Sequence, residues 1–187
     1  MLLAIVGLNG SGKDTVANYL MDNFGFAHKS FSKLIRSEAL CNGLKSDERK
    51  VLVSFANNMR RAAGAGYWAK KILLDYDGAS NLVLTSIRNP AEVREIKLRG
   101  GIIVEVYAGA KKRFERASKR GQYAGDLKMT FNDFKEAEQR ELKSSDPSKQ
   151  QLAACISLAD YRLNNNGSQK DLEKKINSLL KKLAKKK

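Results

Sequence analysis

Several residue types are scarce in this chain of 187 residues. It has two cysteines, Cys41 and Cys155, and one histidine, His28, so no zinc-ligand pattern is present. Two widely separated cysteines give no disulfide framework either, and a reducing cytoplasm is the expected setting. No apolar run approaches the length of a membrane span, and the run Leu2–Val6 lacks the basic flank of a signal peptide. We therefore expect a cytoplasmic protein that does not contact membranes.

Acidic residues are outnumbered by basic ones, 20 against 35, which gives a net charge of +15. A charge of this size suits a solvated surface with several phosphate-binding arginines, and it also suits contact with nucleic acid. The chain has no basic motif interleaved with aromatic residues, no zinc finger and no evident recognition helix. A nucleic-acid partner is therefore kept as an alternative and is not favoured.

Length and composition predict one domain over residues 1–187. Hydrophobic residues make up 42% of the chain, which is ordinary for a globular protein with a core. There is no internal repeat and no linker. Short apolar runs alternate with helical patterns, which predicts an α/β fold of three layers, with helices on both faces of a mostly parallel, five-stranded sheet. The expected strands lie within residues 2–6, 26–31, 81–87, 102–107 and 160–164.

The segment Gly7–Lys13, GLNGSGK, has the G-x-x-x-x-G-K spacing of a phosphate-binding loop, between an apolar strand and a helical pattern. Such a loop aims successive backbone N–H groups at anionic oxygens, and glycines let it bend without a Cβ clash. The helix that follows adds the positive end of its dipole, and Lys13 can reach the outer phosphates. The pattern predicts a P-loop that binds a nucleoside triphosphate.

The usual motif places Ser or Thr after the lysine, as a ligand of Mg²⁺. Here Asp14 stands at that position and Thr15 follows. Because Mg²⁺ takes carboxylate and hydroxyl oxygens, both residues are predicted metal ligands. The predicted ATP-binding residues of this segment are Gly7, Asn9, Gly10, Ser11, Gly12, Lys13, Asp14 and Thr15.

Residues 32–75 are predicted to form a mostly helical insert between two strands, suited to cover an acceptor site, with Ser32 as an N-cap. A later helix, expected at 109–120, places Arg113, Arg116 and Arg120 on one face. It begins a predicted lid over residues 113–130. The Lys-rich end, 181–187, is expected to be a solvated tail.

Six stretches of the chain carry a family resemblance. They are GLNGSGKDT (7–15), FSKLIRSEA (31–39), SIRNPAEV (86–93), RFERASKRG (113–121), SSDPSKQQL (144–152) and LADYRLNNNGS (158–168). With them the chain resembles the small P-loop nucleotide kinases, the group that holds nucleoside-monophosphate kinases and dephospho-CoA kinase. The nearest likeness is to nucleotide-kinase-like domains found alone in archaea or fused to deoxycytidylate-deaminase-like domains.

The resemblance implies roles for residues outside the P-loop. Arg88 would clamp the phosphate of the acceptor, and Arg116 and Arg120 would close over the transferring phosphoryl group. Together with Lys13 these arginines would form the catalytic set. Asn165 and Gly167 would lie along the adenine of ATP. The acceptor contacts implied in this way are Ser32, Arg36, Asn57, Arg60 and Arg88.

Two departures from the family pattern matter. Thr85 stands where these kinases usually carry an Asp at the end of the Walker B strand. Dephospho-CoA kinase uses an Asp after the second strand as a base toward a sugar hydroxyl, whereas here residues 28–32 read HKSFS and hold no carboxylate. A hydroxyl nucleophile benefits from a base, and an anionic monophosphate does not need one. The missing Asp therefore favours a monophosphate acceptor.

The sequence as a whole predicts an enzyme that moves the γ-phosphoryl group of ATP, with Mg²⁺, to a small phosphate-bearing acceptor. A (deoxy)nucleoside monophosphate is the favoured acceptor, with base and sugar left open. The alternatives are a dephospho-CoA kinase-like activity, a nucleotide-binding sensor or partner domain with slow hydrolysis, and a nucleic-acid-associated ATPase. The missing Walker B carboxylate motivates the sensor, and charge alone motivates the last.

Overall fold

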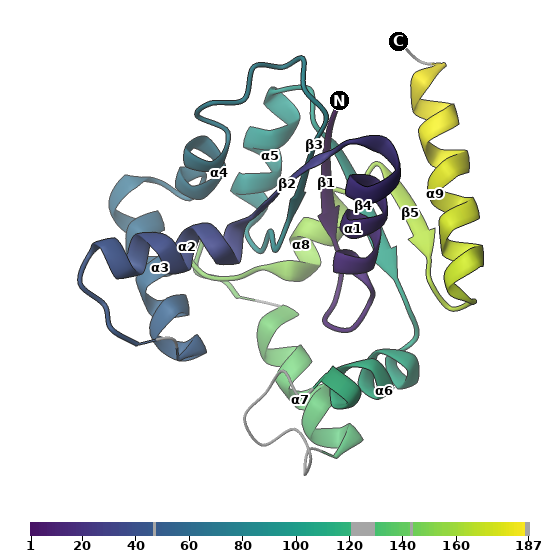
Figure 1. The fold of residues 1–187 in the computed structure, drawn as a ribbon. Coiled ribbons are helices and arrows are strands. Elements are labelled where there is room, and N and C mark those ends of the chain that lie inside the picture. Colours follow the sequence, from purple (N-terminus) through teal and green to yellow (C-terminus); the bar gives the residue numbers. More distant parts are fainter. Residues whose placement is uncertain (47, 121–129, 143, 186–187) are drawn as a thin grey trace.

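The computed structural model describes residues 1–46, 48–120, 130–142 and 144–185 (Figure 1). These residues form a five-stranded sheet with the strand order β2-β3-β1-β4-β5, and every neighbouring pair is parallel. The predicted sheet is therefore confirmed. The strands are β1 (Leu2–Val6), β2 (Ala27–Ser30), β3 (Leu82–Thr85), β4 (Ile102–Tyr107) and β5 (Tyr161–Asn164).

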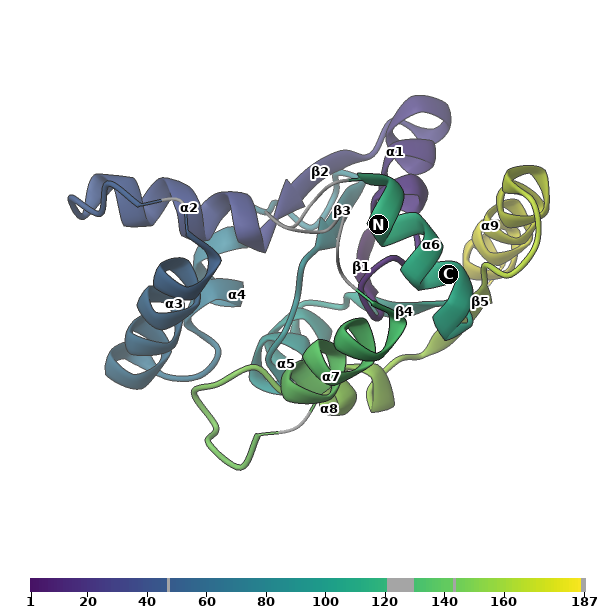
Figure 2. The same cartoon turned by 90° about the horizontal axis from the view of Figure 1, so that it is seen from below.

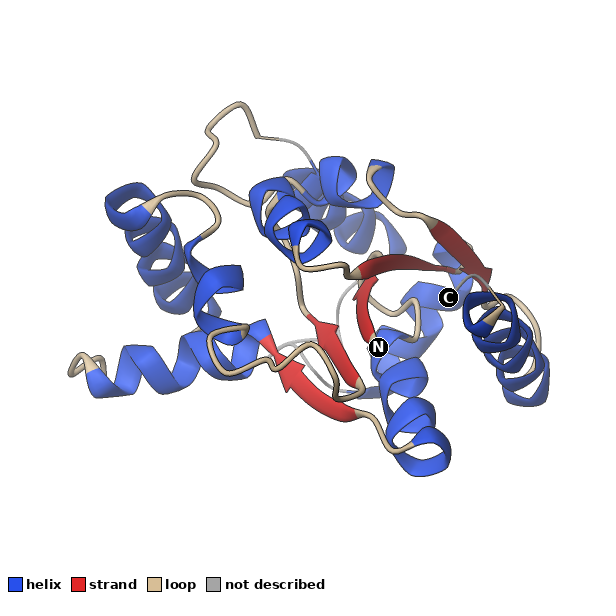
Figure 3. Cartoon of the chain, turned by 90° about the horizontal axis from the view of Figure 1, so that it is seen from above, coloured by secondary structure: helices blue, strands red, loops and turns tan. Residues whose placement is uncertain are grey.

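Helices cover both faces of the sheet, as the alternating pattern predicted (Figure 3). In the described part of the chain, none of them has the length and apolar character needed to cross a membrane. The helices are α1 (Lys13–Phe24), α2 (Phe31–Cys41), α3 (Arg49–Ala63), α4 (Tyr67–Ile72), α5 (Pro90–Leu98), α6 (Ala110–Arg120), α7 (Phe131–Leu142), α8 (Leu152–Ser157) and α9 (Gln169–Ala184).

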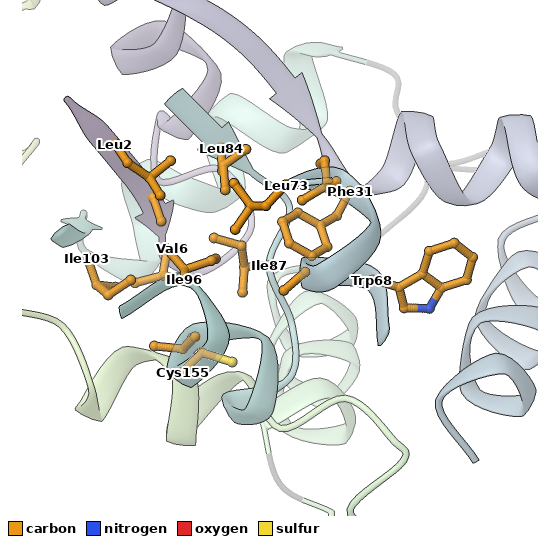
Figure 4. Packing of buried hydrophobic residues seen from close by; sticks show 14 of the residues in the cluster. Leu2, Val6, Phe31, Trp68, Leu73, Leu84, Ile87, Ile96, Ile103 and Cys155 are labelled. Carbon is orange, nitrogen blue, oxygen red and sulfur yellow. The ribbon is translucent and has the colours of Figure 1, made fainter. Parts of the chain in front are cut away.

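Successive side chains of a strand point to opposite sides of the sheet. Because helices cover both sides, the central strands are buried on both faces. Leu3 and Ile5 of β1 face α1 and α9, in one buried cluster. Leu2 and Val6 face the other way, in a second cluster built with α4, α5 and α8 (Figure 4). Cys155 of α8 is buried in this second cluster, and burial raises the pKa of its thiol, so it remains a neutral core residue.

At the carboxyl ends of the strands, the lower edge of the sheet in Figure 1, the chain builds two flanking groups of helices. Figure 2, seen from below, looks onto this edge. The helices α2, α3 and α4 of the predicted insert extend to one side, and α6 and α7 lie together on the other. Residues 121–129 of the predicted lid lie outside the described residues. The edge between these two groups is where ligands of open parallel sheets bind.

The insert begins one residue earlier than predicted. Ser30, the last residue of β2, occupies the N-cap position of α2, and the predicted cap Ser32 lies inside the helix. The reason is Phe31, which is completely buried and so anchors the first turn of the helix in the core. Further along, Trp68 of α4 donates a hydrogen bond from Nε1 to the carbonyl of Ala56 at 3.1 Å, which fixes α4 against α3.

The end of the chain also differs from expectation. Lys181 and Lys182 belong to the last turn of α9, where basic side chains favour the helix dipole. Leu183 follows these two lysines and is buried against the sheet. Residues 181–184 are thus part of the packed helix and not of a solvated tail.

The start of α5 agrees with its sequence signals. Asn89 is the N-cap, Pro90 is the first helical residue, and Glu92 completes a capping box. Asn89 also donates from Nδ2 to the carbonyls of Pro147 at 2.7 Å and Lys149 at 3.0 Å. One side chain therefore both starts the helix and holds the segment before α8 against the end of β3.

Replacing Asn89 by alanine should destabilise the fold more than replacing Ser168, the capping-box residue of the exposed start of α9. Each cap contributes about 1 kcal/mol, and leaving two carbonyls without partners adds about 2 kcal/mol for Asn89 alone. Urea unfolding should therefore show a loss of about 3 kcal/mol for Asn89→Ala against about 1 kcal/mol for Ser168→Ala. Equal losses would show that Asn89 serves only as a cap.

Candidate functional site

Two glycines of the P-loop lie in close contact with residues from other parts of the chain. Gly10 and Gly12 have φ angles of 73° and 99°, in the left-handed region that glycine favours. A Cβ atom at Gly10 would lie 2.4 Å from the carbonyl oxygen of Arg113, and one at Gly12 would lie 2.3 Å from Nδ2 of Asn165. The loop therefore depends on glycine for its conformation and for the approach of these two neighbours.

The donor groups of the loop suit a polyphosphate. Lys13 donates from Nζ to the carbonyls of Gly7 and Leu8, both at 2.9 Å, which keeps its ammonium group over the loop. Ser11 is buried, and among the residues that the structure describes none hydrogen-bonds to its Oγ. Backbone amides at a helix start, an ammonium group and a buried hydroxyl are the donor set that anionic phosphate oxygens require.

Asn165 lies against the P-loop itself. Its Nδ2 donates to the carbonyl of Ser11 at 2.8 Å, and its backbone N donates to the carbonyl of Tyr107 at 2.7 Å. Arg116 of α6 donates from Nη2 to the carbonyl of Asn165 at 3.1 Å and contacts the carbonyl of Ser11 at 3.5 Å. Gly167 is exposed, two residues further on. The structure thus brings the predicted residues Arg116 and Asn165 together at the loop.

Arg113 also lies in this region, although the sequence placed it only on a helical face and gave it no role in the site. It is buried, and it donates from Nε to the carbonyl of Ala108 at 2.9 Å and from Nη1 to the carbonyl of Asn9 at 3.4 Å. Its guanidinium also forms a two-point ion pair with Glu138 of α7, one contact of which is 3.0 Å. The signal in the sequence that could have indicated Arg113 was its position on the same face of the helix as Arg116. The predicted residue Arg120 ends α6, and its side chain lies outside the described residues.

Arg88, the predicted clamp for an acceptor phosphate, follows β3. Its Nη1 donates to Oε1 of Gln150 at 3.3 Å, and its carbonyl accepts from the backbone N of Gln151 at 2.8 Å. Ser32 and Arg36 are exposed on α2, and Asn57 is half-buried on α3. Arg88 therefore lies between the insert and the segment before α8.

Arg60, one of the predicted acceptor contacts, is buried. With Glu92 it forms a buried ion pair at 2.8 Å, in which the side chains are 3% and 0% exposed. Its Nη1 donates to Oδ1 of Asn57 at 3.0 Å. Burial raises the pKa of the Glu92 carboxyl, and the neighbouring Arg60 guanidinium opposes this. Glu92 and Asn57 thus hold the Arg60 guanidinium inside the protein.

At the expected Walker B position the structure has an uncharged pair. Thr85 is 1% exposed, and its Oγ1 is hydrogen-bonded to Nε2 of His28 at 2.8 Å. Burial lowers the pKa of His28, Lys33 lowers it further, and Asp14 opposes the shift, so the neutral imidazole is favoured. Among the described residues, no group of three or more His, Cys, Asp or Glu side chains could hold a metal. Asp14, exposed at the start of α1, is the carboxylate beside the phosphate loop.

Three serine hydroxyls meet at the carboxyl ends of β2 and β3. Ser30 Oγ lies 2.9 Å from Ser32 Oγ, and both lie 3.3 Å from Ser86 Oγ. Ser86 has a φ angle of 67°, the one positive value at a non-glycine residue in the described part of the chain. Such strain is held only where the surroundings enforce it, and it is frequent at functional sites. The cluster gathers small polar groups at the edge of the sheet where β3 leads into Arg88.

A parallel sheet in this strand order, with a P-loop after β1 and a helical insert after β2, defines a P-loop protein of the nucleotide-kinase-like superfamily. Within it the chain belongs to the family whose model is described as an AAA domain and matches residues 3–142, and to the UPF0200 proteins.

The relatives cover almost the whole chain. UPF0200 protein PH1008 of Pyrococcus horikoshii is 31% identical over 192 residues, which cover 98% of this chain and 97% of that protein. UPF0200 protein TK1334 of Thermococcus kodakarensis is 29% identical over 189 residues, 96% of each chain.

Solved structures show the same fold at lower identity. Shikimate kinase from Bacteroides thetaiotaomicron has a TM-score of 0.66 at 16% identity and covers 98% of both chains. Shikimate kinase from Acinetobacter baumannii in complex with shikimate has a TM-score of 0.52 at 19% identity, and the match covers 95% of this chain and 91% of that one.

Asp14→Asn should raise the Mg²⁺ concentration for half-maximal ATP-dependent activity about tenfold, a loss on the order of 1.4 kcal/mol, if the carboxylate holds the metal. Titration of Mg²⁺ against activity measures this, and Asp22→Asn, on the exposed face of the same helix, is the matched control. An unshifted curve for Asp14→Asn would leave this carboxylate with the role of a favourable charge at the helix start.

Proposed function

We propose that the protein transfers the γ-phosphoryl group of ATP, bound with Mg²⁺, to a small phosphate-bearing acceptor, with (deoxy)nucleoside monophosphates as the favoured class. One observation carries this proposal. Lys13 and Arg88 follow β1 and β3, which are neighbouring parallel strands, so both cations stand at the same edge of the sheet. A donor phosphate on the loop and an acceptor phosphate at Arg88 would face each other there.

The chain's own residues support transfer by positioning and by charge. Lys13 and the loop amides would hold the donor phosphates, and Arg88 would hold the acceptor anion. Arg116, already bonded to the loop through Ser11 and Asn165, is near enough to neutralise charge on the migrating group. When bound, Mg²⁺ supplies further neutralisation of the phosphates. An acceptor phosphate oxygen would form the new bond to the γ-phosphorus while the bond to the bridging oxygen of ADP breaks.

The preference for a monophosphate follows from the polar groups near the acceptor. From His28 to Ser32 the chain reads HKSFS, with Ser30 and Ser32 hydrogen-bonded to each other and no carboxylate at the position where dephospho-CoA kinase carries its base. A sugar or alicyclic hydroxyl would need a base to accept its proton, whereas a phosphate is already anionic at neutral pH. Residues 32–75 would then act as the acceptor cover and 113–130 as the lid of one kinase domain. A cytoplasmic setting suits its two free cysteines.

A second function, a nucleotide-binding sensor with slow hydrolysis, is favoured by one specific observation. Thr85 is buried against His28 at the position where a carboxylate would organise the metal and water. A P-loop that binds ATP without this carboxylate could retain binding and lose efficient transfer. Acceptor dependence separates the two functions.

Measurement of ADP release from ATP and Mg²⁺ over a panel of acceptors tests the proposal. The panel holds ribo- and deoxyribonucleoside monophosphates, dephospho-CoA and, because the fold is that of shikimate kinase, shikimate. A monophosphate should stimulate release, and Lys13→Ala should lower it by about 100-fold or more while the protein stays folded. Lys174→Ala, exposed on α9, is the control. ADP release that no acceptor stimulates would favour the sensor.

Replacing Lys181, Lys182 and Lys185 together by glutamine should leave this activity almost unchanged, because the three side chains are exposed at the end of α9. The variant keeps Leu183 and hence the packing of the helix. The same assay with and without single-stranded RNA or DNA provides the measurement. Polynucleotide stimulation that disappears in the variant would support the nucleic-acid-associated ATPase instead.

A further inference from the structure

A single carboxylate connects the acceptor insert to Arg88. Oε1 of Glu92 accepts from Nε of Arg60 on α3 at 2.9 Å and from Nη2 at 2.8 Å. Oε2 of Glu92 accepts from the backbone N of Arg88 at 3.3 Å and from that of Asn89 at 3.2 Å. One oxygen therefore binds the insert, and the other binds the backbone that carries the arginine of the acceptor side.

Stability alone is a weak reason for this arrangement. Two charges that leave water lose solvation free energy which their attraction often fails to recover, and well-packed apolar residues can replace such pairs without loss. Glu92 and Arg60 are both buried, in a region where Val93 and Ile96 of the same helix supply ordinary apolar packing. What an apolar pair could not supply is directional bonding to the backbone N–H groups of Arg88 and Asn89.

The path from Arg60 through Glu92 to Arg88 joins two different parts of the molecule, the helix α3 and the end of β3. On α3, Arg60 is bonded to Asn57, which is half-buried and faces the acceptor side by prediction. At the other end, the Arg88 guanidinium is bonded to Gln150, so its backbone and its side chain are held by separate partners. A shift of α3 would thus reach Arg88 through a short, buried, charged path.

We propose that Glu92 is a positioning residue that couples α3 to the backbone of Arg88 and so aligns the Arg88 guanidinium with the phosphate of the acceptor. This inference rests on the proposed function for the part that concerns the acceptor. The coupling itself, from Arg60 through Glu92 to the two amides, is a property of the ligand-free fold. Glu92 acts through Arg88 and does not touch the substrate.

Steady-state kinetics of Glu92→Gln tests the alignment. The variant should lose about tenfold in kcat/KM for the monophosphate that the wild-type protein prefers, a factor that corresponds to 1.4 kcal/mol, with the KM for ATP changed less than about twofold. Glu95→Gln is the matched control, because Glu95 lies on the same helix and pairs with Lys70 of α4 at 3.6 Å. If Glu92→Gln does not fold, Arg60→Lys, which keeps the charge, should show the same selective loss.

The Arg88→Ala background separates positioning from a general structural effect. If Glu92 acts through Arg88, Glu92→Gln should cost less than about twofold in kcat/KM once Arg88 is removed, because the two losses are not additive. Full additivity, or an equal loss for Glu95→Gln, would overturn the proposal.

Amide hydrogen exchange in the ligand-free protein tests the coupling without any activity. In Glu92→Gln the amides of Arg88 and Asn89 should exchange about tenfold faster than in the wild-type protein and in Glu95→Gln. Unchanged exchange at both amides would overturn the coupling. A wild-type protein that transfers phosphoryl groups to no acceptor would instead refute the proposed function, and the exchange result would still decide whether Glu92 links α3 to Arg88.

Discussion

The conformation of the P-loop depends on the contacts that other parts of the chain make with its backbone. Glycine allows the loop many backbone conformations. The carbonyl of Arg113 lies close to Gly10 and the side-chain amide of Asn165 lies close to Gly12, and these contacts restrict the loop to one conformation. Arg113 and Asn165 come from the segments that follow β4 and β5, on one side of β1 in the sheet. A phosphate site preorganised in this way does not have to pay for ordering its donors when the ligand binds. The order of the strands is therefore what makes the loop a binding site.

The two halves of the site are held by different kinds of interaction. On the donor side, side chains bond to backbone carbonyls of the loop, as Asn165 and Arg116 do with Ser11. Where the acceptor is proposed to bind, a buried ion pair and a capping residue hold the end of β3, through Glu92 and Asn89. Cations predominate at both, and Asp14 lies at the start of α1 beside the phosphate loop. Phosphates on either side would therefore meet complementary charge in a frame that is already bonded.

Local signals in the sequence predicted most of the fold. The strand–loop–helix arrangement of the P-loop and the alternation of strands and helices depend on residues close together in the chain, and both were confirmed. The start of α2 was misplaced by one residue because Phe31 is fixed by the core, which no local pattern reports. The site was harder to predict. Arg60 and Glu92 are 32 residues apart, and no local sequence pattern indicates that they pair. Asn165 and Ser11 are 154 residues apart in the sequence. The family resemblance can suggest that Asn165 lies near the nucleotide, but residue spacing alone does not predict its contact with Ser11.

The chain has one tryptophan, and its position gives the molecule a natural spectroscopic reporter. The indole of Trp68 is fully buried, and its N–H is bonded to the backbone of α3 at Ala56. Tyr67 and Phe55 pack around it, with ring centroids 4.9 Å and 6.0 Å away. Indole emission depends on the polarity around the ring and on this hydrogen bond, and no second tryptophan dilutes the signal. Any change in how α3 lies on α4 would thus alter the intrinsic fluorescence of the whole protein, which makes the helical insert observable in solution without a label.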